Sequence, residues 1–287
     1  MRLSRIPSIE IKTPGQFALM REAGLVVARM LRAAAAAAEP GISTAELDAI
    51  AEREMKAAGA RSSFKGYHGY PGTICTSVND EIVHGIPSDR VRLAAGDVLS
   101  IDAGAIVGGW HGDAAITVPV GAVSAQVTPL LQACELATWH GLSAAVAGRR
   151  LTDISHAVES SALASGGYGV VREYTGHFIG SAMHMDPAVP NYGRPGRGPV
   201  LTEGMALAIE PMLVLGDPRT RLLDDDWTVV TADGSLAAHF EHTVAITADG
   251  PWVLTAEDGG ASGFAMIAAN EVADQLGEQR AVGARGA

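Results

Sequence analysis

Apolar positions repeat at helical spacing over the first part of the chain. Residues 13–16 (Thr-Pro-Gly-Gln) combine an N-cap, a proline at the first helical position and a glutamine at the capping-box position. They predict a long helix that runs to about Ala38, where a Glu-Pro-Gly sequence ends it. Ser43 and Glu46 form a second capping box, which predicts another amphipathic helix that ends near Gly59.

The spacing then changes, and the same order of elements returns later in the chain. Residues 60–119 contain short apolar runs separated by glycine-rich turns, a pattern typical of strands. Thr128-Pro129 predicts the start of a third helix, and a fourth is expected over residues 152–163. Strand patterns return over residues 169–254.

Similar positions in the two parts recur at nearly constant spacing: Leu47 with Ile154, Gly59 with Gly166, and Asp102 with Glu210. This weak repeat indicates two copies of a helix-helix-sheet unit related by a pseudo-twofold axis, with a site between them. We therefore expect one α+β domain over residues 13–256, with halves at about 13–122 and 123–256. An N-terminal arm (1–12) and a C-terminal appendage with a modest helical pattern (257–287) would flank this domain, and disorder after Ala281 is the alternative for the end of the appendage.

Composition narrows the class of protein. The formal net charge of -11 excludes a nucleic-acid binder that depends on phosphate contacts. Two cysteines, Cys75 and Cys134, provide no disulfide framework and suit a reducing compartment. The most apolar stretch, residues 25–38, is interrupted by Arg29 and Arg32, so no membrane span is expected. We therefore expect a cytoplasmic protein without a membrane partner.

Residues 97–113 form a predicted hairpin that carries two aspartates. Two apolar runs flank a Val-Gly-Gly turn, and Asp102 and Asp113 lie about equally far from it. Such residues become cross-strand neighbours, with Cβ atoms about 5 Å apart. Two carboxylates this close repel each other, and in an apolar hairpin they call for a cation. The alternative is a solvated pair at a sheet edge.

The later strands supply partners for these aspartates. His177 lies in a Gly-His-Phe-Ile-Gly sequence, and Glu210 and Glu241 each interrupt an apolar strand pattern. Four carboxylates and one imidazole form an oxygen-rich ligand set, which suits two ions of manganese, iron, cobalt or zinc rather than a structural zinc site. Two such ions activate a bridging water and polarise a carbonyl, the chemistry of amide hydrolysis.

The motifs around these residues resemble those of the methionine aminopeptidases of the creatinase-like, pita-bread family. The shared sequences are Ser-Ile-Asp-Ala-Gly, His-Gly-Asp, Gly-His-Phe-Ile-Gly, Ile-Glu-Pro-Met and Phe-Glu-His-Thr, with further matches over residues 67–71 and 78–87. The resemblance extends over about residues 10–256. It implies a pita-bread fold with a curved central antiparallel sheet, and an enzyme that removes the initiator methionine from nascent polypeptides, at the ribosome.

The resemblance also implies roles for single residues. Asp113 and Glu241 would bridge two divalent ions, Asp102 would bind one of them, and His177 and Glu210 the other. Glu210 would in addition be the general base. Co, Mn, Fe, Zn and Ni all remain open as the metal.

The resemblance implies two further histidines and a methionine pocket. His84 would lie near the scissile amide, and His184 would steady the substrate carbonyl. The pocket implied by the family is lined by Tyr67, Tyr70, Cys75, His84, Met183 and Trp227. These residues would form an apolar cup that suits a thioether side chain.

The chain departs from the family pattern at several positions near the site. Phe178 replaces a glycine, Met183 replaces a common phenylalanine, Phe64 replaces a small residue, and residues 185–187 (Met-Asp-Pro) replace a more acidic pair. We expect Phe178 either to narrow the site or to turn outward to its rim. These changes bear on substrate preference and turnover.

The short interval from Glu210 to Glu241 leaves no room for the helical insertion that type II enzymes of the family carry there. The resemblance therefore favours a minimal type I enzyme, which we expect to be a monomer. The main alternative is an Xaa-Pro peptidase, although those enzymes usually carry a separate N-terminal domain. A non-catalytic interaction protein would be expected to lose ligands and gain basic patches. A structural calcium protein would not need the histidines.

Overall fold

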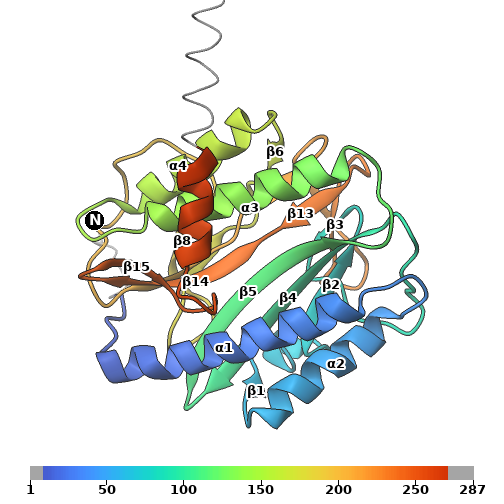
Figure 1. Cartoon of the computed structure of the whole chain (residues 1–287), viewed down its shortest axis with the longest axis horizontal. Helices are drawn as coiled ribbons and strands as arrows, with labels where there is room; N and C mark the ends of the chain where they lie inside the picture. The colour runs from blue at the N-terminus through green and yellow to red at the C-terminus, as the bar shows by residue number, and fades with distance from the viewer. Residues whose placement is uncertain (1–8, 271–287) are drawn as a thin grey trace, which may run out of the picture.

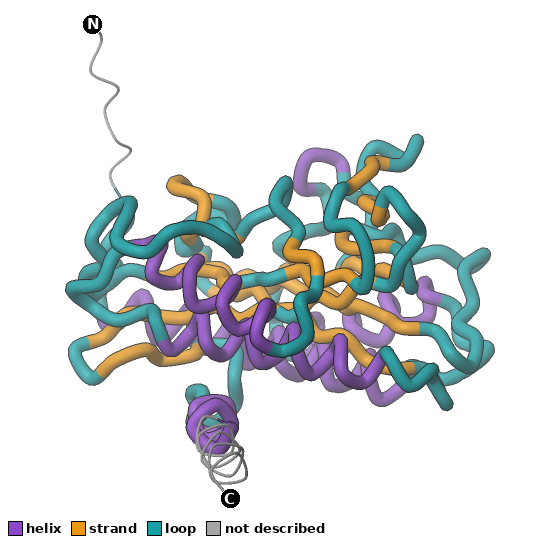
Figure 2. The backbone as a smooth tube through the Cα atoms, turned by 90° about the horizontal axis from the view of Figure 1, so that it is seen from above, coloured by secondary structure: helices purple, strands orange, loops and turns teal. Residues whose placement is uncertain are grey.

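Helices lie against a curved antiparallel sheet in the computed structural model, which describes residues 9–270 (Figure 1). The helices are α1 (Pro14–Ala37), α2 (Thr44–Ala57), α3 (Val127–Ser143), α4 (Leu151–Ala164) and the short 3-10 helix η1 (Tyr67–Gly69). Seen from above, loops and short strands gather on the side of the long strands opposite to the helical segment 261–270 (Figure 2). The sheet thus has one face covered by helices and another framed by loops.

The central sheet has nine strands in the order β1-β4-β5-β14-β9-β7-β8, with β2 added to β4 and β15 added to β14. These strands are β1 (Arg61–Ser62), β2 (Ile74–Val78), β4 (Val98–Val107), β5 (Trp110–Pro119), β7 (Gly176–Phe178), β8 (Met185–Val189), β9 (Ala206–Ile209), β14 (Glu241–Thr247) and β15 (Gly250–Val253). Two three-stranded sheets contain β3 (Glu81–Val83), β6 (Gly169–Val170), β10 (Met212–Val214), β11 (Thr220–Leu222), β12 (Val229–Thr231) and β13 (Ala237–His239). The pairing of β5 with β14 joins the two parts of the chain.

The capping boxes predicted for the first two helices are present. Thr13 accepts from the Gln16 amide while the Gln16 side chain accepts from the Thr13 amide, and α1 ends at Ala37. The third helix differs slightly from the prediction, because it begins at Val127 without a side-chain cap and Pro129 lies within its first turn. Proline fits there because the first amides of a helix have no partner within it.

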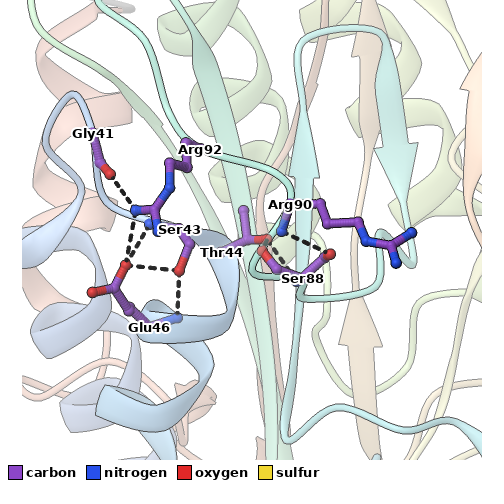
Figure 3. A network of polar contacts seen from close by, with 7 residues as sticks. All are labelled: Gly41, Ser43, Thr44, Glu46, Ser88, Arg90 and Arg92. Carbon is purple, nitrogen blue, oxygen red and sulfur yellow. Dashed lines mark hydrogen bonds and ion pairs between the residues drawn. The ribbon is translucent and has the colours of Figure 1, made fainter.

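The start of α2 shows how a cap is joined to the rest of the fold (Figure 3). The Ser43 hydroxyl accepts from the Glu46 amide at 3.3 Å, and the Glu46 carboxylate accepts from the Ser43 amide at 2.8 Å. Arg92 donates to the Gly41 carbonyl at 2.8 Å and lies 3.5 Å from the same carboxylate. This network ties α2 to the loop that precedes β4, so local helix chemistry and tertiary position support each other.

Each pair of helices packs on its own hydrophobic core. One core joins α1 and α2 to β4 and β5, with Met30, Leu47 and Ile101 fully buried. The other joins α3 and α4 to β9 and β14, with Leu142 and Ile154 fully buried. Each helix pair therefore buries its apolar face against its own part of one sheet.

The turn between β4 and β5 corrects the predicted pairing of the two aspartates. Gly108 and Gly109 form a two-residue turn with φ values of 56° and 87°, which favour glycine. Val107 pairs with Trp110, so Asp102 faces Ala115 and Asp113 faces Gly104. The aspartates are therefore diagonal neighbours rather than directly opposed. Since side chains alternate with a period of two, both still point to the same face of the sheet.

The segments expected to flank the domain are only partly described. Within the predicted arm, the Lys12 amide donates to the Gly204 carbonyl at 2.7 Å. Within the predicted appendage, residues 261–270 are helical, and the Phe264 ring lies 5.6 Å from that of Trp139 on α3. The alternative of disorder after Ala281 falls outside the described residues, and the domain bounds stay predictions.

Candidate metal centre

Strand register brings the carboxylates of both halves onto one face of the sheet. Asp102 of β4 pairs with Ala115 of β5, and Ala115 pairs on its other side with Glu241 of β14. Asp113 precedes Ala115 by two residues and therefore shares its face. Glu210 directly follows β9, where Ile209 faces His242, the residue after Glu241. Four acidic side chains consequently converge around one small alanine.

The ring of His177 completes this cluster. β7 pairs with β9 through His177 and Ala208, and the His177 Nε2 atom lies 3.4 Å from the Glu210 Oε1 atom. The His177 Nδ1 atom is 3.1 Å from the Phe178 carbonyl oxygen, which fixes the ring and turns Nε2 toward the carboxylates. The predicted histidine and glutamate are thus in direct contact.

Two groups of donor atoms lie close enough to surround an ion. One consists of Asp113, His177 and Glu241, and the other of Glu210, His239 and Glu241; within each group the donor atoms lie within 4.8 Å of one another. Glu241 belongs to both groups. Asp102 belongs to neither, although it lines the same cavity as Asp113, Glu210 and Glu241.

The pKa values of these residues are shifted strongly by burial. Burial raises the pKa of Asp102 to about 7. Burial, together with the neighbouring carboxylates, holds the pKa values of Asp113, Glu210 and Glu241 well above their usual range. Burial also lowers the pKa of His177 to about 3, so its imidazole is neutral near pH 7. A neutral imidazole among carboxylates is the form in which these side chains bind metals.

The cluster lacks the partners that would satisfy it without a cation. Oδ1 of Asp102, Oδ1 of Asp113 and Oε1 of Glu241 are buried and accept no hydrogen bond. No lysine or arginine within residues 9–270 forms an ion pair with any of the four carboxylates. Buried carboxylates are costly unless paired or bound to a metal, so the donor set fits divalent cations.

His84 and His184 border the cluster. The ring of His184 lies 4.4 Å from that of His177, and its Nδ1 atom is 3.0 Å from the Tyr67 hydroxyl oxygen. His84 adopts a left-handed backbone with a φ of 62°, a strained conformation typical of functional positions. Its ring packs edge-on against Trp227, and burial lowers its pKa to about 4.

An inner pocket of about 90 Å³ ends at the carboxylates. It brings together the whole predicted methionine pocket and Phe64: the lining includes Phe64, Tyr67, Tyr70, Cys75, His84, Met183 and Trp227. A wider outer cleft of about 420 Å³ leads to the same cluster. The pocket thus has a mainly apolar lining that also includes acidic and imidazole groups.

Phe178 does not border this pocket, so the expectation that it narrows the site or forms its rim is wrong. Its side chain is fully buried in the core under α3 and α4. The reason is strand alternation, because His177 faces the cluster and its neighbour must face the opposite side.

His239 is the residue that the sequence analysis missed. It lies two positions before Glu241, is 1% exposed, and belongs to one of the two donor groups. The one available signal was the His-Phe-Glu spacing, but a lone buried histidine is usually structural. Its place near Glu210 depends on a strand pairing that the sequence does not reveal.

The fold and the metal-binding cluster define a metallopeptidase with the pita-bread architecture. The profile of metallopeptidase family M24 matches residues 18–248, and the chain belongs to this family. Its expected metallo-aminopeptidase class and pita-bread fold are confirmed. None of the helices in residues 9–270 is long and apolar enough to cross a membrane.

The relatives with high sequence identity to this chain include methionine aminopeptidases. The chain is 54% identical over 249 residues to methionine aminopeptidase 1 of Mycobacterium tuberculosis, covering 85% of this chain and 94% of the relative. The crystal structure of methionine aminopeptidase from Thermotoga maritima aligns with a TM-score of 0.85 at 41% identity, over 87% of this chain and all of that one. A prolidase from Pyrococcus furiosus shares the fold, with a TM-score of 0.68 at 24% identity over 86% of this chain and 65% of the prolidase.

Proposed function

We propose that this chain is a methionine aminopeptidase, which hydrolyses the first peptide bond of peptides and nascent proteins that begin with methionine and have a small second residue. The observation that carries the proposal is the small inner pocket, whose lining joins aromatic and sulfur-containing side chains to the carboxylate and histidine cluster. A small pocket beside the cluster suits an exopeptidase, because one terminal side chain would fill it and leave its amide at the cluster.

The pocket fits the methionine side chain in chemistry. Aromatic rings from Tyr70 and Trp227 lie 5.0 Å apart at its wall, and the sulfurs of Cys75 and Met183 add polarisable surface. A thioether gains from contacts of this kind with sulfur and with ring edges. A charged or β-branched terminal side chain would lose these contacts and bind less well.

We assign the metal ligands to Asp102, Asp113, His177, Glu210 and Glu241, which together would hold two divalent ions. When bound, divalent ions would supply a Lewis acid that polarises the scissile carbonyl and lowers the pKa of the attacking water. The identity of the metal within the set Co, Mn, Fe, Zn and Ni is left to direct measurement, because cellular supply as well as ligand type decides it.

The protein residues around the substrate would move and stabilise charge. Glu210 would take the proton of the attacking water, since its carboxylate borders both the cluster and the pocket. The Nδ1 atom of His184 lies 3.0 Å from the Tyr67 hydroxyl oxygen; in the tautomer in which this hydroxyl donates, Nε2 of His184 carries the hydrogen and would stabilise the oxyanion. His84, which lines the same pocket as His184, would hydrogen-bond the scissile amide.

The proposed biological setting follows from the substrate. A nascent polypeptide presents an N-terminal methionine as it leaves the ribosome, so we place the enzyme in the cytoplasm, acting as a monomer on emerging chains. The wider outer cleft would receive the residues that follow the scissile bond.

The test is a comparison of peptides with the metal-loaded protein. We expect release of free methionine from Met-Ala-Ser, and much slower release of leucine from Leu-Ala-Ser, because the branched chain fits the pocket poorly. Peptides of the Xaa-Pro type without methionine should be left intact. Cleavage restricted to Xaa-Pro bonds would refute the proposal and favour the prolidase activity instead.

A further inference from the structure

His239 is a buried histidine without a hydrogen-bond partner. Both of its ring nitrogens are shielded from solvent and unsatisfied. Two other histidines differ, since the half-buried His242 contacts the Thr255 hydroxyl at 2.8 Å and the buried His177 contacts a backbone carbonyl at 3.1 Å. Leaving a buried polar group unsatisfied destabilises the folded chain. An imidazole in this state needs a ligand that the protein itself does not supply.

Its ring faces the metal centre. The Nε2 atom of His239 lies 4.0 Å from Oε2 of Glu210, while Oε1 of Glu210 lies 3.4 Å from His177. Glu210 thus sits between two imidazoles. The donor atoms of His239, Glu210 and Glu241 all lie within 4.8 Å of one another, and His239 lines the cleft that reaches the cluster.

The backbone of His239 is held firmly in this place. The Thr117 hydroxyl accepts from the His239 amide at 2.8 Å and donates to the His239 carbonyl at 2.7 Å. Thr117 lies on β5 two residues beyond Ala115, so the strand that carries Asp113 also positions His239. Met212 of β10 pairs with His239 on the other side.

We propose that His239 is a further protein ligand of the metal centre, which adds a second nitrogen donor beside Glu210 and Glu241. The inference rests on the proposed function, because it assigns one more donor to the same centre. A second imidazole makes the ligand set softer, and imidazole suits cobalt, nickel and zinc better than manganese. His239 therefore biases the centre toward these metals.

The test is metal binding by calorimetry on the full chain, freed of metal and titrated with Co²⁺ and then with Mn²⁺. His239→Gln should weaken Co²⁺ binding by about tenfold or more, and Mn²⁺ binding by clearly less. His242→Gln is the matched control, because His242 is a half-buried histidine one residue after Glu241 that contacts Thr255 and Trp139 instead of the cluster. This control should bind both ions as the unaltered chain does.

A second measurement avoids substitution and any loss of folding. In the NMR spectrum of the Co²⁺-loaded unaltered chain, two hyperfine-shifted imidazole N–H signals are expected, from His177 and His239. One such signal, or equal losses of Co²⁺ and Mn²⁺ affinity in His239→Gln, would overturn the inference while leaving the proposed function intact. Failure of the unaltered chain to bind either Co²⁺ or Mn²⁺ would overturn both the inference and the proposed function.

Discussion

Glu210 is the residue to which we assign two roles, because its carboxylate contacts His177 within the carboxylate cluster and also lines the inner pocket. We predict that Glu210→Ala abolishes methionine release, since one change removes a metal ligand and the proposed base. The loss should exceed about 10²-fold in kcat. Glu203→Gln is the control, because Glu203 is an exposed acid on the loop before β9 and should keep full activity. Substantial turnover by Glu210→Ala would remove Glu210 as the base.

The raised pKa values of the carboxylates predict that metal binding releases protons. In the metal-free protein, burial raises the pKa of Asp102 to about 7 and, together with the neighbouring carboxylates, holds the pKa values of Asp113, Glu210 and Glu241 well above their usual range, so the cluster holds protons near neutral pH. A cation must displace these protons, and its affinity should therefore rise as the pH rises toward about 7. His177 adds no protons, because burial already keeps it neutral.

Calorimetry in buffers of different ionisation enthalpy measures this release directly. Metal binding at pH 6 should release at least one proton for each protein chain. A binding enthalpy that does not depend on the buffer would show that the carboxylates are already ionised.

The side chains of β7 point alternately to the two faces of the sheet, and this alternation places Phe178 in the core. Its ring is buried in the core while the preceding residue faces the site. We predict that Phe178→Ala lowers the free energy of unfolding by about 3–5 kcal/mol through loss of packing. The KM for methionine peptides should remain nearly unchanged in the fraction that stays folded, as denaturant titration and peptide kinetics would show. A changed KM with unchanged stability would place the ring at the substrate instead.

Close packing between α1 and the sheet depends on glycine. A Cβ added at Gly24 would lie 2.3 Å from the Leu254 carbonyl oxygen, and one at Gly112 would lie 2.7 Å from the Gly24 amide nitrogen. We predict that Gly24→Ala destabilises the protein by about 1–3 kcal/mol, measured by urea unfolding. Gly15→Ala, in the first turn of the same helix, meets no atom within 4 Å and should be neutral or slightly stabilising. Equal effects of the two changes would contradict this packing.

The elements were largely predictable because their signals are local. Capping residues at Thr13 and Ser43 marked helix starts, and glycines marked turns. The exact register of Asp102 and Asp113 was not predictable, because moving the turn by one residue changes which residues face each other. The orientation of Phe178 was missed for a similar reason, since the resemblance gave its position but not its side of the strand.

At the scale of the whole molecule, the site exists only where the two parts of the chain meet. β5 carries Asp113, β14 carries Glu241, and their pairing brings acids from both halves together. The sequence motifs pointed to these residues through their resemblance to a family. Their spacing alone did not decide between a metal site and a solvated pair of aspartates at a sheet edge. The sequence did not predict His239 as part of the site, because its proximity to Glu210 arises from tertiary contacts between β13 and the central sheet.

Metal dependence of methionine release tests the central claim most directly. The chain would be stripped of metal with a chelator, dialysed, and assayed on Met-Ala-Ser before and after a divalent ion is added back. We predict no free methionine from the stripped protein and restored release with Co²⁺ or Mn²⁺. Methionine release that persists without metal, or no release with any divalent ion, would contradict the account.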